Sequence, residues 1–209
     1  WIMWNAQWMA LGQGATVCLY DGAPNHPDML ALWRFAAEEK LTYFGAGAAF
    51  FSGCLKAGIT PPREAVDLSH LRSLGSTGSP LSADAYDWIY REVKEDVWLA
   101  PISGGTDLAG AFVLGHPGMP VRAGEMQCRA LGNAVRAYDP NGNELVGEVG
   151  ELVCTQPLPS MPLFFWGDDD GSRLFESYYD TYPGIWRHGD WISIDEGGAS
   201  VIYGRSDAT

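Results

Sequence analysis

Two kinds of apolar pattern alternate along the first half of this 209-residue chain, and the alternation restricts the fold more than any other feature. Short continuous apolar runs, which are typical of buried strands, are separated by segments in which apolar side chains recur at helical spacing. Such β-α-β-α order places helices on the faces of a mostly parallel sheet, so the sequence predicts an α/β fold. The expected strands span residues 15–20, 41–44, 71–75 and 97–102.

Residues with known preferences for helix ends define the helices between these strands. Pro27 suits the first position of a helix that runs to Lys40. A second helix is expected over residues 48–57 and should end at Gly58, because glycine readily adopts the left-handed conformation of a helix end. Ser82 is a good N-cap for a third helix.

The second half of the chain is richer in strands and turns. Pro140-Asn141-Gly142 predicts a hairpin, because Asn-Gly readily adopts positive φ. We therefore expect an α/β lobe over residues 1–102, followed by a β-rich lobe over residues 103–209. The strands expected in the second lobe span residues 111–114, 125–130, 134–138, 151–154, 191–194 and 199–203.

The charge of the chain restricts its partners. Thirteen Lys and Arg residues against 26 Asp and Glu residues give a formal net charge of −13. This balance argues against a nucleic-acid groove or an anionic membrane surface, so we expect small-molecule ligands held by local donors or a metal. The cysteines are far apart and form no Cys-x-x-Cys motif, so a reducing cytoplasm is the expected location.

Neither end of the sequence has the features expected of a natural terminus. The first residues, from Trp1 to Asn5, lack an initiator Met and the basic flank of a signal peptide. The apolar run that continues to Leu11 is shorter than the roughly 20 residues needed to span a bilayer, so we expect a buried segment. The chain stops at Thr209 directly after an expected strand, and we therefore expect it to be cut at both ends.

A glycine-rich pentapeptide, Ser-Gly-Gly-Thr-Asp at residues 103–107, follows the last strand of the first lobe. Its glycines allow the backbone to approach a ligand closely. Thr106 can donate to a phosphoryl oxygen, and Asp107 can hold Mg²⁺, which prefers oxygen ligands. The simpler interpretation is a glycine turn in which Thr106 or Asp107 caps the next element.

Three further segments carry groups suited to a nucleotide. Residues 75–82 join a strand to a helix through small residues that can pass beneath a planar ring or a phosphate. Asp190 precedes a strand and can accept hydrogen bonds from both hydroxyls of a ribose. Arg205 can reach a ribose or phosphate oxygen, although a surface ion pair with Asp207 would also account for it.

Several familiar signatures fail. The chain has no Walker A loop, and its histidines lack metal-ligand spacing. The acidic run at 168–171 lacks the ligands of a calcium loop and is expected to be a solvated turn. A serine hydrolase could use Ser103 with His116 or His188, but Pro101 stands where its nucleophile turn requires glycine.

The ordered motifs resemble those of the acyl-adenylate-forming superfamily. They are Gly-Ser-Thr-Gly-Ser-Pro at 75–80, Ser-Gly-Gly-Thr-Asp at 103–107, His-Gly-Asp-Trp at 188–191 and Gly-Arg-Ser-Asp at 204–207. Within the superfamily the chain is most similar to acetoacetyl-CoA synthetases, over its whole length. That similarity rests on Leu-Tyr-Asp-Gly at 19–22, Pro-Val-Arg-Ala-Gly-Glu at 120–125, Pro-Ser-Met-Pro at 159–162 and Phe-Trp-Gly-Asp at 165–168.

The resemblance implies a ligase that uses ATP, Mg²⁺ and coenzyme A. Acetoacetate would form an acyl-adenylate, and the thiol of coenzyme A would then displace AMP. The alternatives are another short- or medium-chain acyl-CoA synthetase, a serine hydrolase or a noncatalytic nucleotide-binding module. The implied roles are α-phosphate contact for Thr106, the metal for Asp107, the adenine wall for Gly78, Ser79, Pro80 and Ile202, the ribose for Asp190 and Arg205, the acyl pocket for Thr77 and Gly104, and the hinge for Asp207.

Two further expectations follow from the resemblance. Acetyl-CoA synthetases have tryptophan at the position of Gly104, so glycine is expected to leave room for acetoacetate, and Gly104→Trp to favour acetate. The phosphate loop of the family would precede Trp1, and the C-terminal domain with its adenylation lysine would follow Thr209. We therefore expect little or no ligase activity from this segment by itself.

Overall fold

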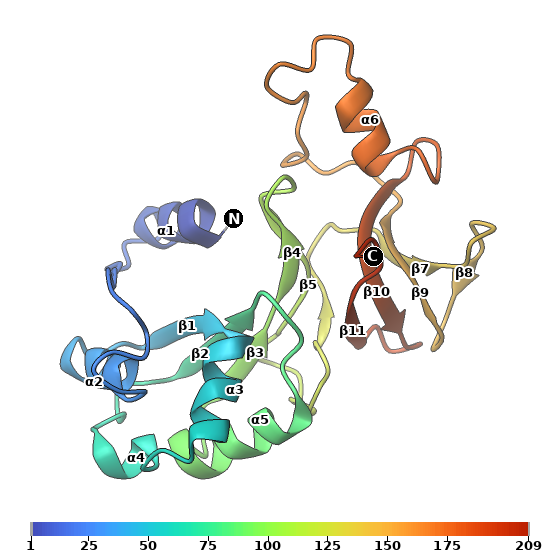
Figure 1. The fold of residues 1–209 in the computed structure, drawn as a ribbon. Helices are drawn as coiled ribbons and strands as arrows, with labels where there is room; N and C mark the ends of the chain where they lie inside the picture. Colours follow the sequence, from blue (N-terminus) through green and yellow to red (C-terminus); the bar gives the residue numbers. More distant parts are fainter. Residues whose placement is uncertain (1, 209) are drawn as a thin grey trace.

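The computed structural model describes residues 2–208, with side chains described from residue 6, so Trp1 and Thr209 lie outside the described residues (Figure 1). The predicted parallel sheet is confirmed. Its three strands lie in the order β1-β2-β3, and both pairings are parallel. The strand expected at 15–20 is wrong, because these residues form an irregular connection. The bounds are β1 Tyr43–Gly47, β2 Ser73–Thr77 and β3 Trp98–Pro101.

Helix α3 (Ala48–Ala57) has the predicted bounds, and Gly58 ends it in the left-handed conformation with φ 56°. Ser82 caps α5 (Ala83–Trp88) as predicted, since its hydroxyl accepts the backbone N–H of Ala85. This helix continues as a π-helical turn, Ile89–Val93. A short helix that was not expected, α4 (Pro62–Ala65), begins at the second of two prolines.

Helix α2 (Ala31–Glu38) begins later than Pro27, where the sequence placed its start. The carboxylate of Asp28 accepts the backbone N–H of Leu30 at 2.8 Å and pairs with Arg34 at 2.9 Å. The residues between Pro27 and the helix therefore form a turn with its own hydrogen bonds.

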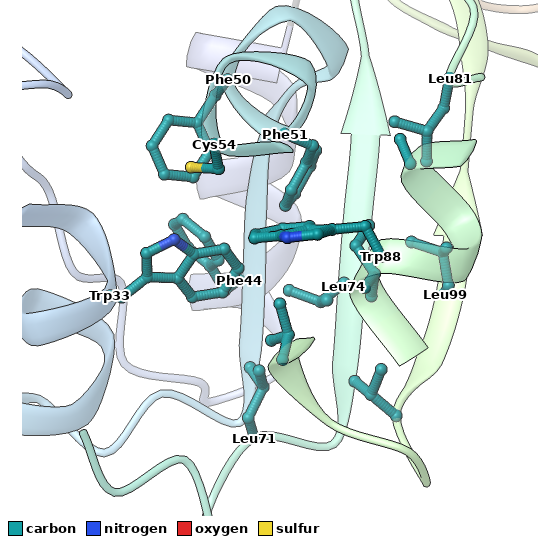
Figure 2. Packing of buried hydrophobic residues seen from close by; sticks show 14 of the residues in the cluster. Trp33, Phe44, Phe50, Phe51, Cys54, Leu71, Leu74, Leu81, Trp88 and Leu99 are labelled. Atoms are coloured by element: carbon teal, nitrogen blue, oxygen red, sulfur yellow. The ribbon is translucent and has the colours of Figure 1, made fainter. Parts of the chain in front are cut away.

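The helices cover one face of the parallel sheet rather than both faces. Phe44, Leu74 and Leu99 are aligned on neighbouring strands and pack against Trp33 of α2 and Trp88 of α5 (Figure 2). These side chains are buried, and they share one apolar core with the phenylalanines of α3. The expected flanking helices are therefore present, and they pack on one face of the sheet.

The opposite face of the sheet is covered differently. The ring of Tyr43 lies over Gly75, where a Cβ atom would be only 2.0 Å from the tyrosine oxygen. Ala100 meets the backbone of Gly115, which belongs to the second half of the chain. The Tyr43 ring and the segment that contains Gly115 therefore cover this face where a second layer of helices could have packed.

The second half contains two antiparallel sheets, and its β-rich character is confirmed. The predicted hairpin turn joins β7 to β8, with Gly142 at φ 82°. Helix α6 (Ser172–Tyr178) was not expected. One sheet contains β4 Ser103–Gly105, β5 Gly110–Leu114 and β6 Cys128–Arg129, and the other contains β7 Val135–Tyr138, β8 Glu144–Leu145, β9 Val149–Cys154, β10 Trp186–Ile194 and β11 Ser200–Arg205.

The N-terminal helix α1 (Ile2–Gly12) stands apart from the sheets in Figure 1. Trp8 and Met9 are 72% and 70% exposed, so the expectation of a buried segment is wrong over the residues whose side chains are described. None of the described helices is both long and apolar enough to cross a bilayer. The division into lobes at 102/103 stays a prediction, although separate apolar cores form on either side of it.

Candidate functional site

A cavity of about 930 Å³ lies where the two halves of the chain meet. It opens beyond the carboxyl ends of β2 and β3, the usual place for ligands in an open α/β sheet. Every residue that the resemblance assigns to the adenylate site lines it: Thr77, Gly78, Ser79, Pro80, Gly104, Thr106, Asp107, Asp190, Ile202, Arg205 and Asp207.

The loop after β2 forms one wall of the cavity. Gly78 has φ 87°, a conformation that side chains rarely adopt, and its Cβ position faces open space. Ser79 and Pro80 are exposed within the same wall. The wall therefore presents backbone and small side chains, a surface suited to a flat ring.

The glycine-rich pentapeptide begins as a short strand, β4, rather than as the turn that was the simpler expectation. A Cβ atom on Gly104 would lie 2.0 Å from the carbonyl oxygen of Gly110 in β5. A Cβ atom on Gly105 would lie 2.6 Å from Cε1 of His188. Gly104 lines the cavity, but a side chain at this position would first meet the backbone of β5. The expectation that Gly104→Trp simply fills the acyl pocket and favours acetate therefore has no simple geometric basis.

Thr106 and Asp107 follow β4 and are exposed in the cavity. The hydroxyl of Tyr178, at the end of α6, donates to Oδ2 of Asp107 at 2.5 Å. Tyr178 also stacks on Trp186, with ring centroids 3.6 Å apart. Burial and the neighbouring Asp107 raise the pKa of the Tyr178 hydroxyl, so it remains a donor near neutral pH.

A β-bulge brings the charged residues of β10 into the cavity. The register of β10 with β9 shifts between Arg187 and Trp191, and Asp190 faces Arg205 across the pairing with β11. The guanidinium of Arg205 lies 3.3 Å from Asp190. It also donates to both carboxylate oxygens of Asp207, from Nε to Oδ1 at 2.8 Å and from Nη2 to Oδ2. The ion pair foreseen with Asp207 therefore exists, but it belongs to a three-residue cluster.

Burial shifts the pKa values of two neighbouring groups in opposite directions. It raises the pKa of Asp190 to about 6, although Arg205 acts to lower it. Burial lowers the pKa of His188 to about 4, and the charge of Arg205 lowers it further. At neutral pH the cavity therefore holds a neutral imidazole beside an ionised carboxylate.

The geometry does not support the serine hydrolase. His188 lies 3.7 Å from Asp190 and packs edge-on against Phe112, while His116 accepts the backbone N–H of Gly118. Within residues 6–208, no hydrogen bond joins Ser103 to a histidine. The catalytic relay that this reaction requires is therefore not formed.

Two residues of the site were not foreseen from the sequence. No sequence pattern points to Tyr178, because the acidic run before it predicts only a solvated turn. That prediction is wrong for Asp168, which is buried and accepts the backbone N–H groups of Arg173 and Leu174 at the start of α6. Glu151 was missed because it looks like an ordinary polar residue in an expected strand. It is 5% exposed and lies behind the bulge of β10.

A magnesium site is compatible with the groups present. No cluster of three or more His, Cys, Asp or Glu side chains arranged for a metal occurs in the described part of the chain. Mg²⁺ commonly needs only one or two protein carboxylates together with substrate phosphates. Asp107 supplies one such carboxylate, with one oxygen engaged by Tyr178 and the other available.

Comparison with known families identifies the type of site. Residues 2–162 match the family model described as AMP-binding enzyme. The chain belongs to this family. The cavity combines a small-residue wall with a paired carboxylate and guanidinium.

Individual relatives of this AMP-binding enzyme show which members of the family it is similar to. It is 48% identical to an acetoacetyl-coenzyme A synthetase of Rhizobium meliloti (strain 1021) and 43% identical to an acetoacetyl-CoA synthetase of Rattus norvegicus. Each match covers 100% of this chain but only 32% and 31% of the relatives. The chain thus spans about a third of the length of the relatives it matches.

Solved structures agree with the fold. The chain matches acetoacetyl-CoA synthetase from Streptomyces lividans with a TM-score of 0.91 and 47% identity, over 100% of this chain and 33% of that one. It matches the anthranilate CoA ligase AuaEII, solved with anthranoyl-AMP, with a TM-score of 0.76 and 22% identity, over 93% and 35% of the two chains. The second likeness concerns the fold alone.

Proposed function

We propose that this AMP-binding enzyme takes part in the ATP-dependent activation of acetoacetate and its transfer to coenzyme A. The observation that carries the proposal is the convergence of all four motif segments on one cavity. Similarity to acetoacetyl-CoA synthetases over the whole chain supports acetoacetate as the acid.

In the first half-reaction, a carboxylate oxygen of acetoacetate bonds to the α-phosphorus of ATP while the bond to pyrophosphate breaks. Thr106 donates its hydroxyl to an α-phosphate oxygen and stabilises the charge that develops there. Asp107 would hold Mg²⁺, which neutralises phosphate charge when bound. Tyr178 fixes the orientation of Asp107 through its hydrogen bond.

The nucleoside has its own set of contacts. Gly78, Ser79 and Pro80 provide the wall for adenine, together with the buried side chain of Ile202. Asp190 accepts hydrogen bonds from the ribose hydroxyls, and Arg205 donates to a ribose oxygen. These contacts hold the α-phosphate beside Thr106, which supplies the orientation on which the reaction depends.

In the second half-reaction, the sulfur of coenzyme A bonds to the carbonyl carbon of the acyl-adenylate, the thiol proton is lost, and AMP leaves. Thr77 and Gly104 border the acyl group, and Asp207 would be the hinge between the two half-reactions. The free thiols Cys18, Cys54, Cys128 and Cys154 support a reducing compartment, and we place the enzyme in the cytoplasm.

Exchange of labelled pyrophosphate into ATP tests the reaction and the acid together. Because the chain spans about a third of its relatives, it is inserted in place of the matching segment of the Rhizobium meliloti synthetase. We expect exchange with acetoacetate to exceed exchange with acetate and butyrate. A preference for acetate or butyrate would favour another acyl-CoA synthetase, and AMP binding without exchange would favour a noncatalytic module.

Thr106→Val in the same chimera tests the role of the hydroxyl. We expect exchange to fall by about 100-fold, because the group stabilises charge in the transition state. Thr60→Val is the matched control, since Thr60 is exposed in the loop after α3. Equal exchange rates in the two variants would remove Thr106 from the mechanism.

A further inference from the structure

Glu151 is a buried carboxylate that borders the site without lining the cavity. It lies in β9 and is 5% exposed. Its neighbour across the strand pair is Trp191, at the point where the register of β10 shifts. A carboxylate that is removed from water must be paired and hydrogen-bonded, so its partners define what it holds in place.

Three partners surround this carboxylate: Arg187 and Gly189 of β10, and Ser206 directly after β11. Oε1 accepts the backbone N–H of Gly189 at 3.0 Å. The hydroxyl of Ser206 lies 2.9 Å from Oε1 and 2.7 Å from Oε2, so it can donate to either oxygen. The guanidinium of Arg187 approaches Oε2 at 3.2 Å.

These contacts fix the two segments that carry the charged cluster. Gly189 precedes Asp190, and Ser206 follows Arg205. The backbone N–H of Ser206 also donates to the carbonyl of Gly189 at 2.8 Å, which closes the network. Gly189 has φ 84°, and a Cβ atom there would lie 2.7 Å from both Arg205 and Asp207, so the bulge fits closely around the cluster.

We propose that Glu151 is a positioning residue for Asp190 and Arg205, which contact the ribose in the proposed function on which this inference rests. It acts through Gly189 and Ser206, because its own side chain does not line the cavity. Its carboxylate sets the conformation of the β10 bulge and the distance between the two strands that present the ribose-binding groups.

The test uses the chimera described above and compares its Glu151→Gln variant with the parent chimera by calorimetric titration of two ligands, AMP and 2′,3′-dideoxy-AMP. An amide keeps the size of the side chain but loses one acceptor oxygen and the charge. We expect the affinity for AMP to fall roughly tenfold and that for the dideoxy ligand by less than about twofold, because only AMP uses the ribose hydroxyls. Glu148→Gln is the matched control, since Glu148 is exposed just before the same strand.

An equal loss for both ligands would indicate a merely structural role and would overturn the inference, as would unchanged AMP affinity. Ser206→Ala is the milder second variant, with an expected loss of about threefold confined to AMP. Hydrogen exchange of the Gly189 amide is measured without ligand and should accelerate in Glu151→Gln but not in Glu148→Gln. A parent chimera that does not bind AMP would contradict the proposed function, whereas unchanged exchange at Gly189 would contradict the role of Glu151.

Discussion

The parallel sheet and the five-stranded sheet border the same cavity but contribute different chemistry to it. The parallel sheet rests on a core of Trp33, Trp88 and phenylalanine rings, and its loop presents backbone and small side chains to the ligand. The five-stranded sheet presents His188, Asp190 and Arg205, and it buries Glu151 behind them.

This difference indicates which region contributes more to the stability of the fold and which contributes more to ligand binding. Apolar packing carries no cost of burying charge, so the aromatic core of the first region should contribute more to the free energy of unfolding than the charged cluster of the second. Buried charges stabilise a fold weakly, because desolvation offsets much of their attraction. The charged cluster of the second region should therefore affect ligand affinity and pH dependence more than it affects stability at neutral pH.

The largest expected effect is a loss of stability when the apolar core of the first region is disrupted. Trp33→Ala removes a fully buried ring at the centre of the core and should lower the free energy of unfolding by about 3–5 kcal/mol. Urea denaturation measures the change. The control is Trp166→Ala, because Trp166 is 94% exposed and its loss should matter by less than about 0.5 kcal/mol. Similar losses in the two variants would contradict this assignment of stability to the core.

The next effect comes from His188 in the second region. The folded protein keeps the imidazole neutral down to a pKa of about 4, while the unfolded chain takes up a proton near 6.5. As pH falls through this window the unfolded state binds more protons, so stability falls. Relative to His188→Gln, the parent should lose about 2 kcal/mol between about pH 7 and pH 5.

Denaturant titration at the two pH values checks this difference, with His70→Gln as the control because His70 is exposed. Asp190 remains in both proteins, and its raised pKa acts in the opposite direction, so the comparison isolates the imidazole. Parallel pH profiles for the parent and His188→Gln would show that burial of His188 does not govern stability.

A smaller effect concerns affinity. Asp190 protonates as pH falls below its pKa of about 6 and then accepts hydrogen bonds from ribose poorly. Binding of adenosine, which has no phosphate to titrate, should weaken about tenfold between about pH 7 and pH 5. Asp190→Asn should bind adenosine weakly with little dependence on pH. A pH dependence that persists in this variant would assign the titration to another group.

The smallest expected effect is the loss of stability when Tyr178 loses its hydroxyl but keeps its ring. Tyr178→Phe keeps the stacking on Trp186 but removes the hydrogen bond to Asp107, and it should lower the free energy of unfolding by about 0.5–1.5 kcal/mol. Tyr20→Phe is the matched control, since it keeps a ring contact with Phe35 and loses only an exposed hydrogen bond. Thermal unfolding that does not distinguish the two variants would make the Tyr178 hydroxyl dispensable for stability.

The sequence predicted best where short-range chemistry decides the structure. Gly58 and Ser82 mark helix ends because their own backbone and side chain satisfy the end groups. The site residues could be grouped because the order of the motifs resembles a known superfamily, and the cavity brings them together. Their individual roles stay predictions.

Features that depend on contacts distant in the chain escaped the sequence. Tyr43 covers Gly75 in place of a helix, and no local pattern signals that contact. Tyr178 reaches Asp107 across 71 positions, and Glu151 reaches Ser206 across 55. The strand expected at 15–20 does not form, because its apolar residues find no partner strand within residues 2–208.

The cluster of Asp190, Arg205 and Asp207 has a consequence for the direction in which a nucleotide enters. Two carboxylates against one guanidinium leave one negative charge uncompensated above about pH 6. Phosphate is repelled from such a cluster, whereas uncharged hydroxyls find acceptors there. If Asp190 and Arg205 hold the ribose as proposed, the net negative charge of the cluster would orient the nucleotide with its phosphate toward Thr106 before any bond is formed.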